Sequence, residues 1–157
     1  MGRIGLTVPS GSVLGLDTSI FIYHFEAHPV YLPLTDELLV GIESGRWEAV
    51  TSVITLIEIS VRPLQLERPY VARQYEALLA NFPHLKIFDV DRQIARTAAK
   101  LRVEYRLRPA DALQVAACLQ AGCQVFITND RRLEPLNPIL RIIILDDYLN
   151  ERQNASP

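Results

Sequence analysis

Residues 12–19 read SVLGLDTS, and the interpretation of the whole chain starts from this segment. Residues 12–16 form a short, mainly apolar run without the 3.6-residue period of a helix, which is typical of a buried β-strand. The run ends at Asp17, and Thr18 or Ser19 can cap a helix that follows. A carboxylate therefore comes directly after a buried strand, the place where open α/β sheets bind their ligands.

The same alternation of strand and helix patterns continues along the chain. Further apolar runs, at residues 48–51, 85–90, 124–128 and 141–145, predict four more strands. Between them, apolar residues recur at intervals of three and four, as in amphipathic helices. This pattern predicts an α/β domain with five short parallel strands and helices on both faces of the sheet.

The chain of 157 residues has the size of one domain. The alternating pattern occupies residues 13–149. We expect residues 1–12, which contain several glycines and a proline, to be a flexible N-terminal segment, and residues 150–157 to be a disordered C-terminal tail. The sequence shows neither a signal-peptide core nor an apolar stretch of membrane-spanning length, so we expect a cytoplasmic protein without membrane contact.

Four acidic residues, Asp17, Glu58, Asp111 and Asp130, lie where apolar segments begin or end. Each has an ordinary explanation: Asp17 and Asp130 can cap helices, Asp111 can favour a helix N-terminus, and Glu58 can point to solvent. If they converge at one sheet edge, however, two carboxylates about 4 Å apart repel by roughly 4 kcal/mol at an effective dielectric of about 20. A hard divalent cation removes this repulsion, so the sequence predicts a Mg²⁺ or Mn²⁺ site.

The charge of the chain is unevenly distributed. The net charge is −2, but residues 62–108 hold ten Lys or Arg against five Asp or Glu, a balance of +5 that leaves −7 elsewhere. An acidic site beside a basic segment suits a substrate that carries phosphates and reacts at a metal. Five arginines lie shortly before Asp111 in the sequence: Arg92, Arg96, Arg102, Arg106 and Arg108. We predict that at least one side of the helix they mark, with Arg102 and Arg106, helps to guide such a substrate. Alternatively, they form the solvated side of an amphipathic helix.

Four short segments together resemble the PIN-domain nucleases, and especially the VapC-type toxins of type II toxin–antitoxin pairs. The segments are Leu16-Asp17-Thr18-Ser19, the helix from Ser52 to Glu58, Pro109-Ala110-Asp111-Ala112, and Thr128-Asn129-Asp130-Arg131. The resemblance extends from Val13 to about Leu145. It implies a PIN-like three-layer fold with a parallel sheet in the order 3-2-1-4-5, which places Asp17 and Asp130 at the point where the strand order reverses.

The resemblance also implies roles for individual residues. The metal-binding and catalytic positions match the four acids named above, and polar supporting positions match Thr18, Ser19, Thr128 and Asn129. The implied activity is that of a Mg²⁺-dependent endoribonuclease, in which Mn²⁺ can substitute, with RNA as substrate, a cognate antitoxin as partner and a homodimer as the assembly. Arg131-Arg132-Leu133 follows Asp130 where some relatives carry a further acid, which argues against a second, fully ligated metal.

Other functions require features that this sequence lacks. A haloacid-dehalogenase-type phosphatase needs a second aspartate two residues after Asp17, where this chain has Ser19, and a response-regulator receiver needs a lysine near the end of the last strand. A non-catalytic PIN-like module that binds RNA or protein remains the alternative from a different class. The four acids argue against it, because phosphate binding alone favours the removal of negative charge.

Overall fold

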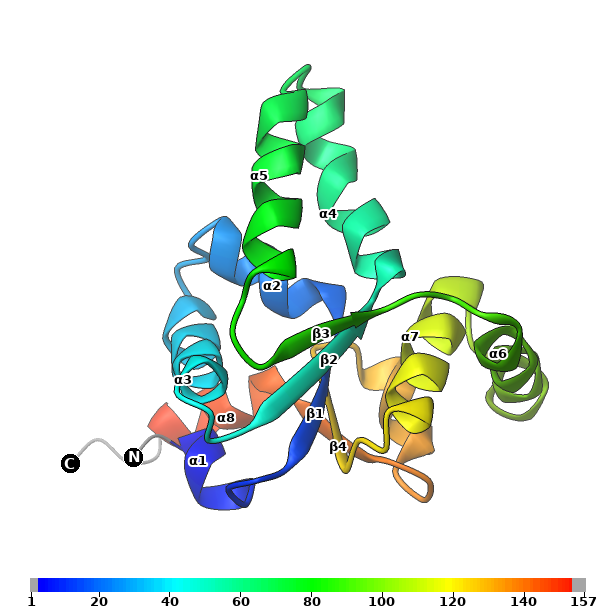
Figure 1. Ribbon diagram of the computed structural model, residues 1–157. Coiled ribbons are helices and arrows are strands. Elements are labelled where there is room, and N and C mark those ends of the chain that lie inside the picture. Colours follow the sequence, from blue (N-terminus) through cyan, green and yellow to red (C-terminus); the bar gives the residue numbers. More distant parts are fainter. Residues whose placement is uncertain (1–2, 154–157) are drawn as a thin grey trace.

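The computed structural model describes residues 3–153 and contains one parallel five-stranded sheet (Figure 1). The strands are β1 (Val13–Leu16), β2 (Glu48–Ser52), β3 (Leu85–Phe88), β4 (Val125–Thr128) and β5 (Arg141–Ile144). Their order is β3-β2-β1-β4-β5, with parallel pairing at every interface. The predicted fold class and strand order are therefore confirmed.

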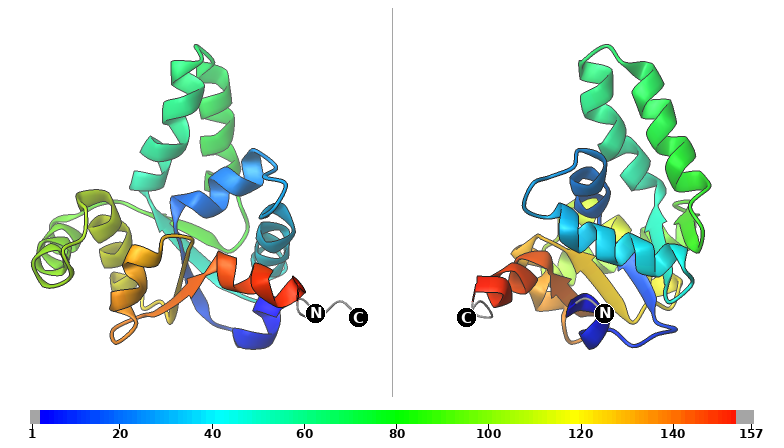
Figure 2. Two further views of the ribbon diagram at one scale, coloured as in Figure 1. Left: turned by 180° about the vertical axis from the view of Figure 1, so that it is seen from behind. Right: turned by 90° about the vertical axis from the view of Figure 1, so that its left-hand side faces the viewer.

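Helices cover both faces of this sheet, as Figures 1 and 2 show. The α-helices are α1 (Arg3–Thr7), α2 (Thr18–Phe25), α3 (Leu32–Glu43), α4 (Val53–Gln65), α5 (Pro69–Ala80), α6 (Arg92–Tyr105), α7 (Pro109–Gln120) and α8 (Leu145–Gln153), and a 3₁₀ helix, η1, spans Arg131–Leu136. Helices α4 and α5 pack against each other and project from the sheet as a pair (Figure 1). Within residues 3–153, no helix is both long and apolar enough to span a membrane.

The alternation of side chains along the central strands supplies two separate hydrophobic cores. Leu14 and Leu16 of β1 belong to the core that includes α1, α2, α3 and α8. Phe126 of β4 belongs to the core that includes α6, α7 and η1, whereas its neighbours Val125 and Ile127 face the first core. Because successive strand residues point to opposite faces, strands buried on both sides read as continuous apolar runs. The apolar runs along the sequence predict the strands for this reason.

Both ends of the chain differ from expectation. We expected residues 1–12 to be flexible, but residues 3–7 form α1, and Ile4 and Val8 are buried in the first core. The C-terminal tail was expected from residue 150, yet α8 continues to Gln153. Packing of apolar side chains therefore orders a terminal segment that is too short to show a clear helical period. Residues 1–2 and 154–157 of these two predictions lie outside the described part of the chain.

Pro63 lies within a helix, although proline is unfavourable in a helix interior. It lies inside α4, which continues to Gln65, and its ring is buried. A proline removes one backbone donor and kinks a helix. The buried ring contributes apolar contact that offsets part of this cost.

Gly41 of α3 is required by the neighbouring indole ring. Trp47 is fully buried, and its Nε1 donates a hydrogen bond of 3.2 Å to the carbonyl oxygen of Pro9. A Cβ atom built at Gly41 would overlap the six-membered ring of Trp47, with Cε3 at only 2.6 Å. The close approach of the helix backbone to this ring therefore excludes a side chain.

Replacement of Gly41 by alanine should destabilise the fold. In an exposed helix this change stabilises by about 1 kcal/mol, but here we expect the overlap with Trp47 to outweigh that gain and to lower the free energy of unfolding by about 1–3 kcal/mol. Urea denaturation measures the difference. The matched control is Val40→Ala on the same helix, where the side chain is 62% exposed and the change should stay within about 0.5 kcal/mol. A Gly41→Ala protein as stable as the parent would contradict the packing described here.

Candidate functional site

The four predicted acids line one cavity at the carboxyl edge of the sheet. The cavity has a volume of about 370 Å³. Its walls are formed by Asp17, Thr18, Ser19, Ile22, Tyr23, Glu58, Arg108, Ala110, Asp111, Asn129 and Asp130. Four different segments supply the acids: the end of β1, helix α4, the first turn of α7, and the residues after β4. The cavity lies at the reversal of strand order between β1 and β4, where ligand sites of open α/β sheets occur.

Asp17 caps a helix and also faces the cavity. Its Oδ1 accepts a hydrogen bond of 2.8 Å from the backbone N–H of Thr18, which makes it the N-cap of α2. Its Oδ2 accepts a hydrogen bond of 2.6 Å from the hydroxyl of Thr128. The ordinary explanation of Asp17 as a cap is therefore true, but capping does not exclude a role in the cavity.

Burial raises the pKa of Asp17 to about 6. Desolvation of the carboxylate is the main cause, and the negative charges of Asp111 and Glu58 add to it. The hydrogen bonds from Thr128 and Thr18 act in the opposite direction, because they stabilise the ionised form. The net result is a carboxylate that is costly to ionise unless positive charge is close.

Asp111 and Asp130 share an arginine. Arg108 lies with its Nε 3.5 Å from Oδ2 of Asp111 and its Nη2 3.8 Å from Oδ2 of Asp130. Desolvation raises the pKa of Asp111, and the positive charge of Arg108 lowers it in part. Both contacts are longer than a good hydrogen bond, so Arg108 is a loosely held cation in the cavity wall.

Asp130 makes a tighter contact with Arg132. The arginine Nε lies 2.9 and 3.1 Å from the two carboxylate oxygens, and its Nη2 lies 2.6 Å from Oδ2. The backbone N–H of Arg132 also donates to Oδ1 at 3.0 Å, so Asp130 is the N-cap of η1. Here too, the expected capping role coexists with a place in the cavity wall.

The predicted polar neighbours occupy distinct positions around the acids. Thr128 is fully buried and supports both aspartates that follow the strands, because its hydroxyl donates to Asp17 and accepts from the backbone N–H of Asp130. Asn129 lines the cavity and accepts from the N–H of Asp146 at the start of α8. Ser19 also lines the cavity, and its Oγ is buried without a hydrogen-bond partner among the residues described. An orphaned hydroxyl beside carboxylates is suited to donate to a ligand oxygen or a water.

Arg102 and Arg106, two of the arginines expected to guide the substrate, do not line this cavity. Arg102 donates from Nε to the carbonyl oxygen of Leu107 at 3.2 Å, and Arg106 caps α6 in a left-handed conformation. The described residues that form the cavity wall include Arg108 instead. A sequence signal for it existed, since Arg108 precedes Asp111 by three residues, at the start of a helix. Of the five arginines expected to guide the substrate, Arg108 is therefore the one that lines the cavity.

The side chains of the four acids are suitable ligands for a hard cation, although they do not converge closely enough to ligate one directly. Carboxylate oxygens are the preferred ligands of Mg²⁺ and Mn²⁺. Among residues 3–153, no group of three or more acidic, His or Cys side chains is close enough to ligate an ion as it stands. Thr18 holds Glu58 at 2.8 Å, and Arg132 holds Asp130. The donor set and the orphaned Ser19 hydroxyl fit a hydrated ion, which contacts some ligands through water.

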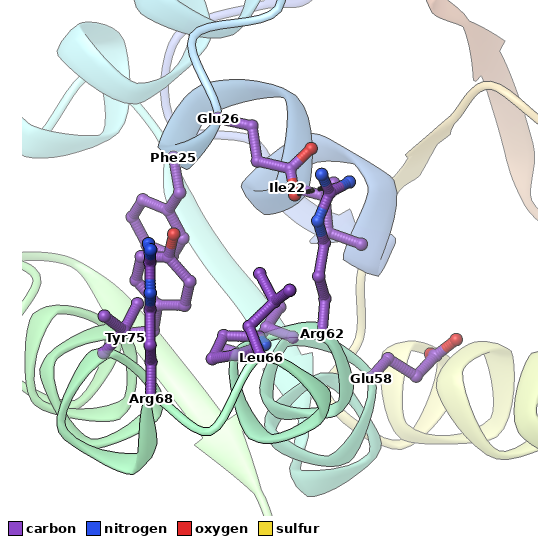
Figure 3. A pocket seen from close by; sticks show the side chains of 11 residues that line it. Ile22, Phe25, Glu26, Glu58, Arg62, Leu66, Arg68 and Tyr75 are labelled. Atoms are coloured by element: carbon purple, nitrogen blue, oxygen red, sulfur yellow. Dashed lines mark ion pairs between the residues drawn. The ribbon is translucent and has the colours of Figure 1, made fainter.

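A second cavity, of about 330 Å³, adjoins the first and is mainly apolar. It lies between α2 and the α4–α5 pair, and it shares Ile22 and Glu58 with the acidic cavity. Figure 3 shows Glu58 at one end, and Phe25 with Tyr75 at the other. The rings of Phe25 and Tyr75 stack with centroids 4.7 Å apart.

Comparison with known proteins gives a family and a fold. The family described as PIN domain matches residues 15–136, well over half of the chain. No curated protein matches the chain significantly. Solved structures with the same fold include DNA-bound VapBC from Salmonella typhimurium (TM-score 0.61, 22% identity, covering 86% of this chain and 98% of that chain). They also include VapBC2 from Rickettsia felis bound to a promoter DNA fragment (TM-score 0.63, 17% identity, covering 84% of this chain and 98% of that chain). A third is VapBC-5 from Mycobacterium tuberculosis (TM-score 0.56, 24% identity, covering 87% of this chain and 98% of that chain).

The raised pKa of Asp17 predicts how stability depends on pH. Because the folded protein holds this proton up to about pH 6 and the unfolded chain releases it near 3.8, the parent loses stability as the pH rises between these values. Asp17→Asn removes this loss. In EDTA, the free energy of unfolding of the variant should rise relative to that of the parent between pH 4 and pH 6, by at most about 3 kcal/mol.

Urea denaturation of both proteins at several pH values measures this difference in the free energy of unfolding. Asp89→Asn, an exposed aspartate, controls for the general effect of the exchange. If the difference between Asp17→Asn and the parent does not change between pH 4 and pH 7, Asp17 acts only as a cap and the account of its burial is wrong.

Proposed function

Because the chain belongs to the PIN domain family, we propose that it is a metal-dependent endoribonuclease and the toxin of a type II toxin–antitoxin pair, acting in the cytoplasm. One observation carries the catalytic part of the proposal. Four carboxylates from separate segments line a single cavity at the carboxyl edge of the sheet, and burial raises the pKa of two of them, Asp17 and Asp111. Such an arrangement is unfavourable for a folded protein unless a cation binds there.

The ion would be Mg²⁺, with Mn²⁺ able to substitute. Asp17, Asp111, Asp130 and Glu58 would hold it, directly or through water. When bound, it would supply an acidified water and Lewis-acid stabilisation of charge on the phosphoryl group. This proposal also explains why the chain keeps four acids beside a polyanionic substrate, which the alternative of a non-catalytic RNA-binding module does not.

The protein side chains would orient the substrate and the attacking water. We propose that Glu58 or Asp111 accepts a hydrogen bond from the water that attacks the phosphorus in line with the leaving 3′ oxygen. The orphaned hydroxyl of Ser19 can donate to a non-bridging phosphate oxygen. Arg108, which is loosely paired with Asp111 and Asp130, can turn to the same phosphate without losing a strong contact.

The proposed antitoxin has a place to bind in the second cavity. Its apolar side chains suit the apolar face of a peptide helix, and Glu58 joins it to the acidic cavity. A peptide bound there could extend a basic side chain to the carboxylates and cover them. The similar structures named above are complexes of VapBC, which supports a protein partner for this chain. We also propose a homodimer, which light scattering of the purified protein tests.

Cleavage of total RNA tests the enzymatic proposal. We expect the parent to cut RNA with Mg²⁺ or Mn²⁺ and to stop when EDTA is added. Asp17→Asn and Asp111→Asn should each lower the rate by at least about 100-fold, more than the loss typical of an outer-shell residue. Asp89→Asn controls for purification and folding. Cleavage that survives EDTA, or that persists in both cavity variants, would refute the metal-dependent site.

A matched pair of variants tests the antitoxin site. Leu66 lines the second cavity and is 56% exposed, whereas Val103 lies on α6 and is 85% exposed. For complexes with the product of the neighbouring gene, Leu66→Asp should weaken binding roughly tenfold or more, as the loss of an apolar anchor does. Val103→Asp should have little effect. Equal affinities for the two variants would place the partner elsewhere, and a neighbouring gene product that does not bind would contradict the pairing.

A further inference from the structure

A glutamine beneath the acidic cavity connects two of its walls. Gln114 lies on α7 one turn beyond Asp111, and its side chain is only 3% exposed. We propose that Gln114 is a positioning residue that holds the carboxylate of Glu58 toward the cavity by acting through Thr18. The importance of Gln114 for cleavage rests on the proposed function, but its effect on the contact between Thr18 and Glu58 does not.

The orientation of the Gln114 amide is fixed by its neighbours. The backbone N–H of Ser52 lies 3.2 Å from Oε1, and the Ser52 hydroxyl lies 2.8 Å from the same atom. A backbone N–H can only donate, so the amide oxygen must face Ser52. The amide nitrogen then faces the other way, with Nε2 3.2 Å from Oγ1 of Thr18 and 2.7 Å from Oγ1 of Thr55.

The hydroxyl hydrogens follow from the groups that can only accept. Thr51 donates to the carbonyl oxygen of Leu16 at 3.1 Å, so it must accept the hydrogen bond of 2.7 Å that links it to Thr55. Thr55 therefore donates to Thr51. Thr18 donates to Oε1 of Glu58 at 2.8 Å. Both N–H groups of Gln114 are thus used, and each hydroxyl accepts one hydrogen bond and donates another.

This arrangement favours the pairing of Thr18 with Glu58 over a pairing of the two threonines with each other. The Oγ1 atoms of Thr18 and Thr55 are only 3.0 Å apart, close enough for a direct hydrogen bond. Because Gln114 donates to both oxygens, the hydrogen of Thr18 is directed outward to Glu58. Without the amide, Thr18 can donate to Thr55 instead and release Glu58 from its place. Burial strengthens the effect, since hydrogen bonds in a low-dielectric interior polarise one another.

Gln114 also joins α7 to the end of β2 through Ser52, so its replacement will lower stability as well. A stability measurement alone therefore cannot distinguish the positioning of Glu58 from the contribution of Gln114 to the packing of α7 against β2. Thr51→Val provides the control, because it removes hydrogen bonds from the same buried group of side chains but leaves the connection from Gln114 through Thr18 to Glu58 in place.

The experiment compares Gln114→Met, which keeps the length of the side chain but has no donor, with Thr51→Val. Mn²⁺ affinity is measured by calorimetry well below the melting temperature of each variant, together with the rate of RNA cleavage. We expect Gln114→Met to lose about 10–100-fold in Mn²⁺ affinity and in cleavage rate, the range typical for residues that orient a metal ligand without touching the metal. Thr51→Val should be destabilised without a comparable loss. A Gln114→Met protein that binds Mn²⁺ as well as Thr51→Val does would overturn the proposal.

A second comparison tests whether the effect passes through Glu58. In a Glu58→Gln background, Gln114→Met should lower Mn²⁺ affinity by less than about twofold, since the residue on which it acts has been replaced. An undiminished loss in that background would also overturn the proposal.

A parent protein that neither binds Mn²⁺ nor cuts RNA would refute the proposed function instead. In that case a crystal structure of Gln114→Met decides the present inference. Loss of the contact between Thr18 and Glu58 supports it, and an unchanged contact overturns it.

Discussion

The negative charge that the sheet gathers at its carboxyl edge is the constraint on which the candidate site depends. Parallel strands end at one edge, so Asp17 and the residues after β4 are brought together by the pairing of β1 with β4. Helices α4 and α7 then add Glu58 and Asp111 to the same cavity. Partial burial of Asp17, Asp111 and Asp130 makes this charge costly, whereas Glu58 is exposed. The nearby hydroxyl and guanidinium groups are best understood as a response to that cost.

Two kinds of neighbour offset the charge, and they differ in mobility. Thr128 and Thr18 are buried, and their hydroxyls donate at 2.6 and 2.8 Å to Asp17 and Glu58. Arg108 and Arg132 approach from the exposed side and neutralise Asp130. Buried donors hold fixed positions, whereas exposed arginines can exchange one anion for another. The site therefore combines hydroxyl donors to two acids with exposed arginines beside a third.

Much of the fold, but less of the site, could be predicted from the sequence. Strands buried on both faces leave continuous apolar runs in the sequence. Acids at the ends of such runs, as at Asp17 and Asp130, can therefore be placed at the carboxyl edge of the sheet from the sequence alone. The strand order was predicted from the family resemblance, because periodicity says nothing about which strands are neighbours. Helix α1 was missed because its ordering depends on tertiary packing of Ile4 rather than on a local pattern. Arg108 lies in the cavity wall as the N-cap residue of α7, close to Asp111, whereas Arg102 lies on α6. The proposed role of Gln114 depends on contacts between residues about 60 to 100 positions apart.

Anomalous diffraction from a crystal grown with MnCl₂ shows whether the acidic cavity binds a metal ion. We expect a manganese peak inside the acidic cavity, ligated by at least one of Asp17 and Asp111 at about 2.1 Å, with the tight contact between Arg132 and Asp130 released or lengthened. A cavity without manganese at millimolar MnCl₂, with Arg132 still on Asp130, would contradict this expectation. The four carboxylates would then be helix caps and surface charges that happen to share a cavity.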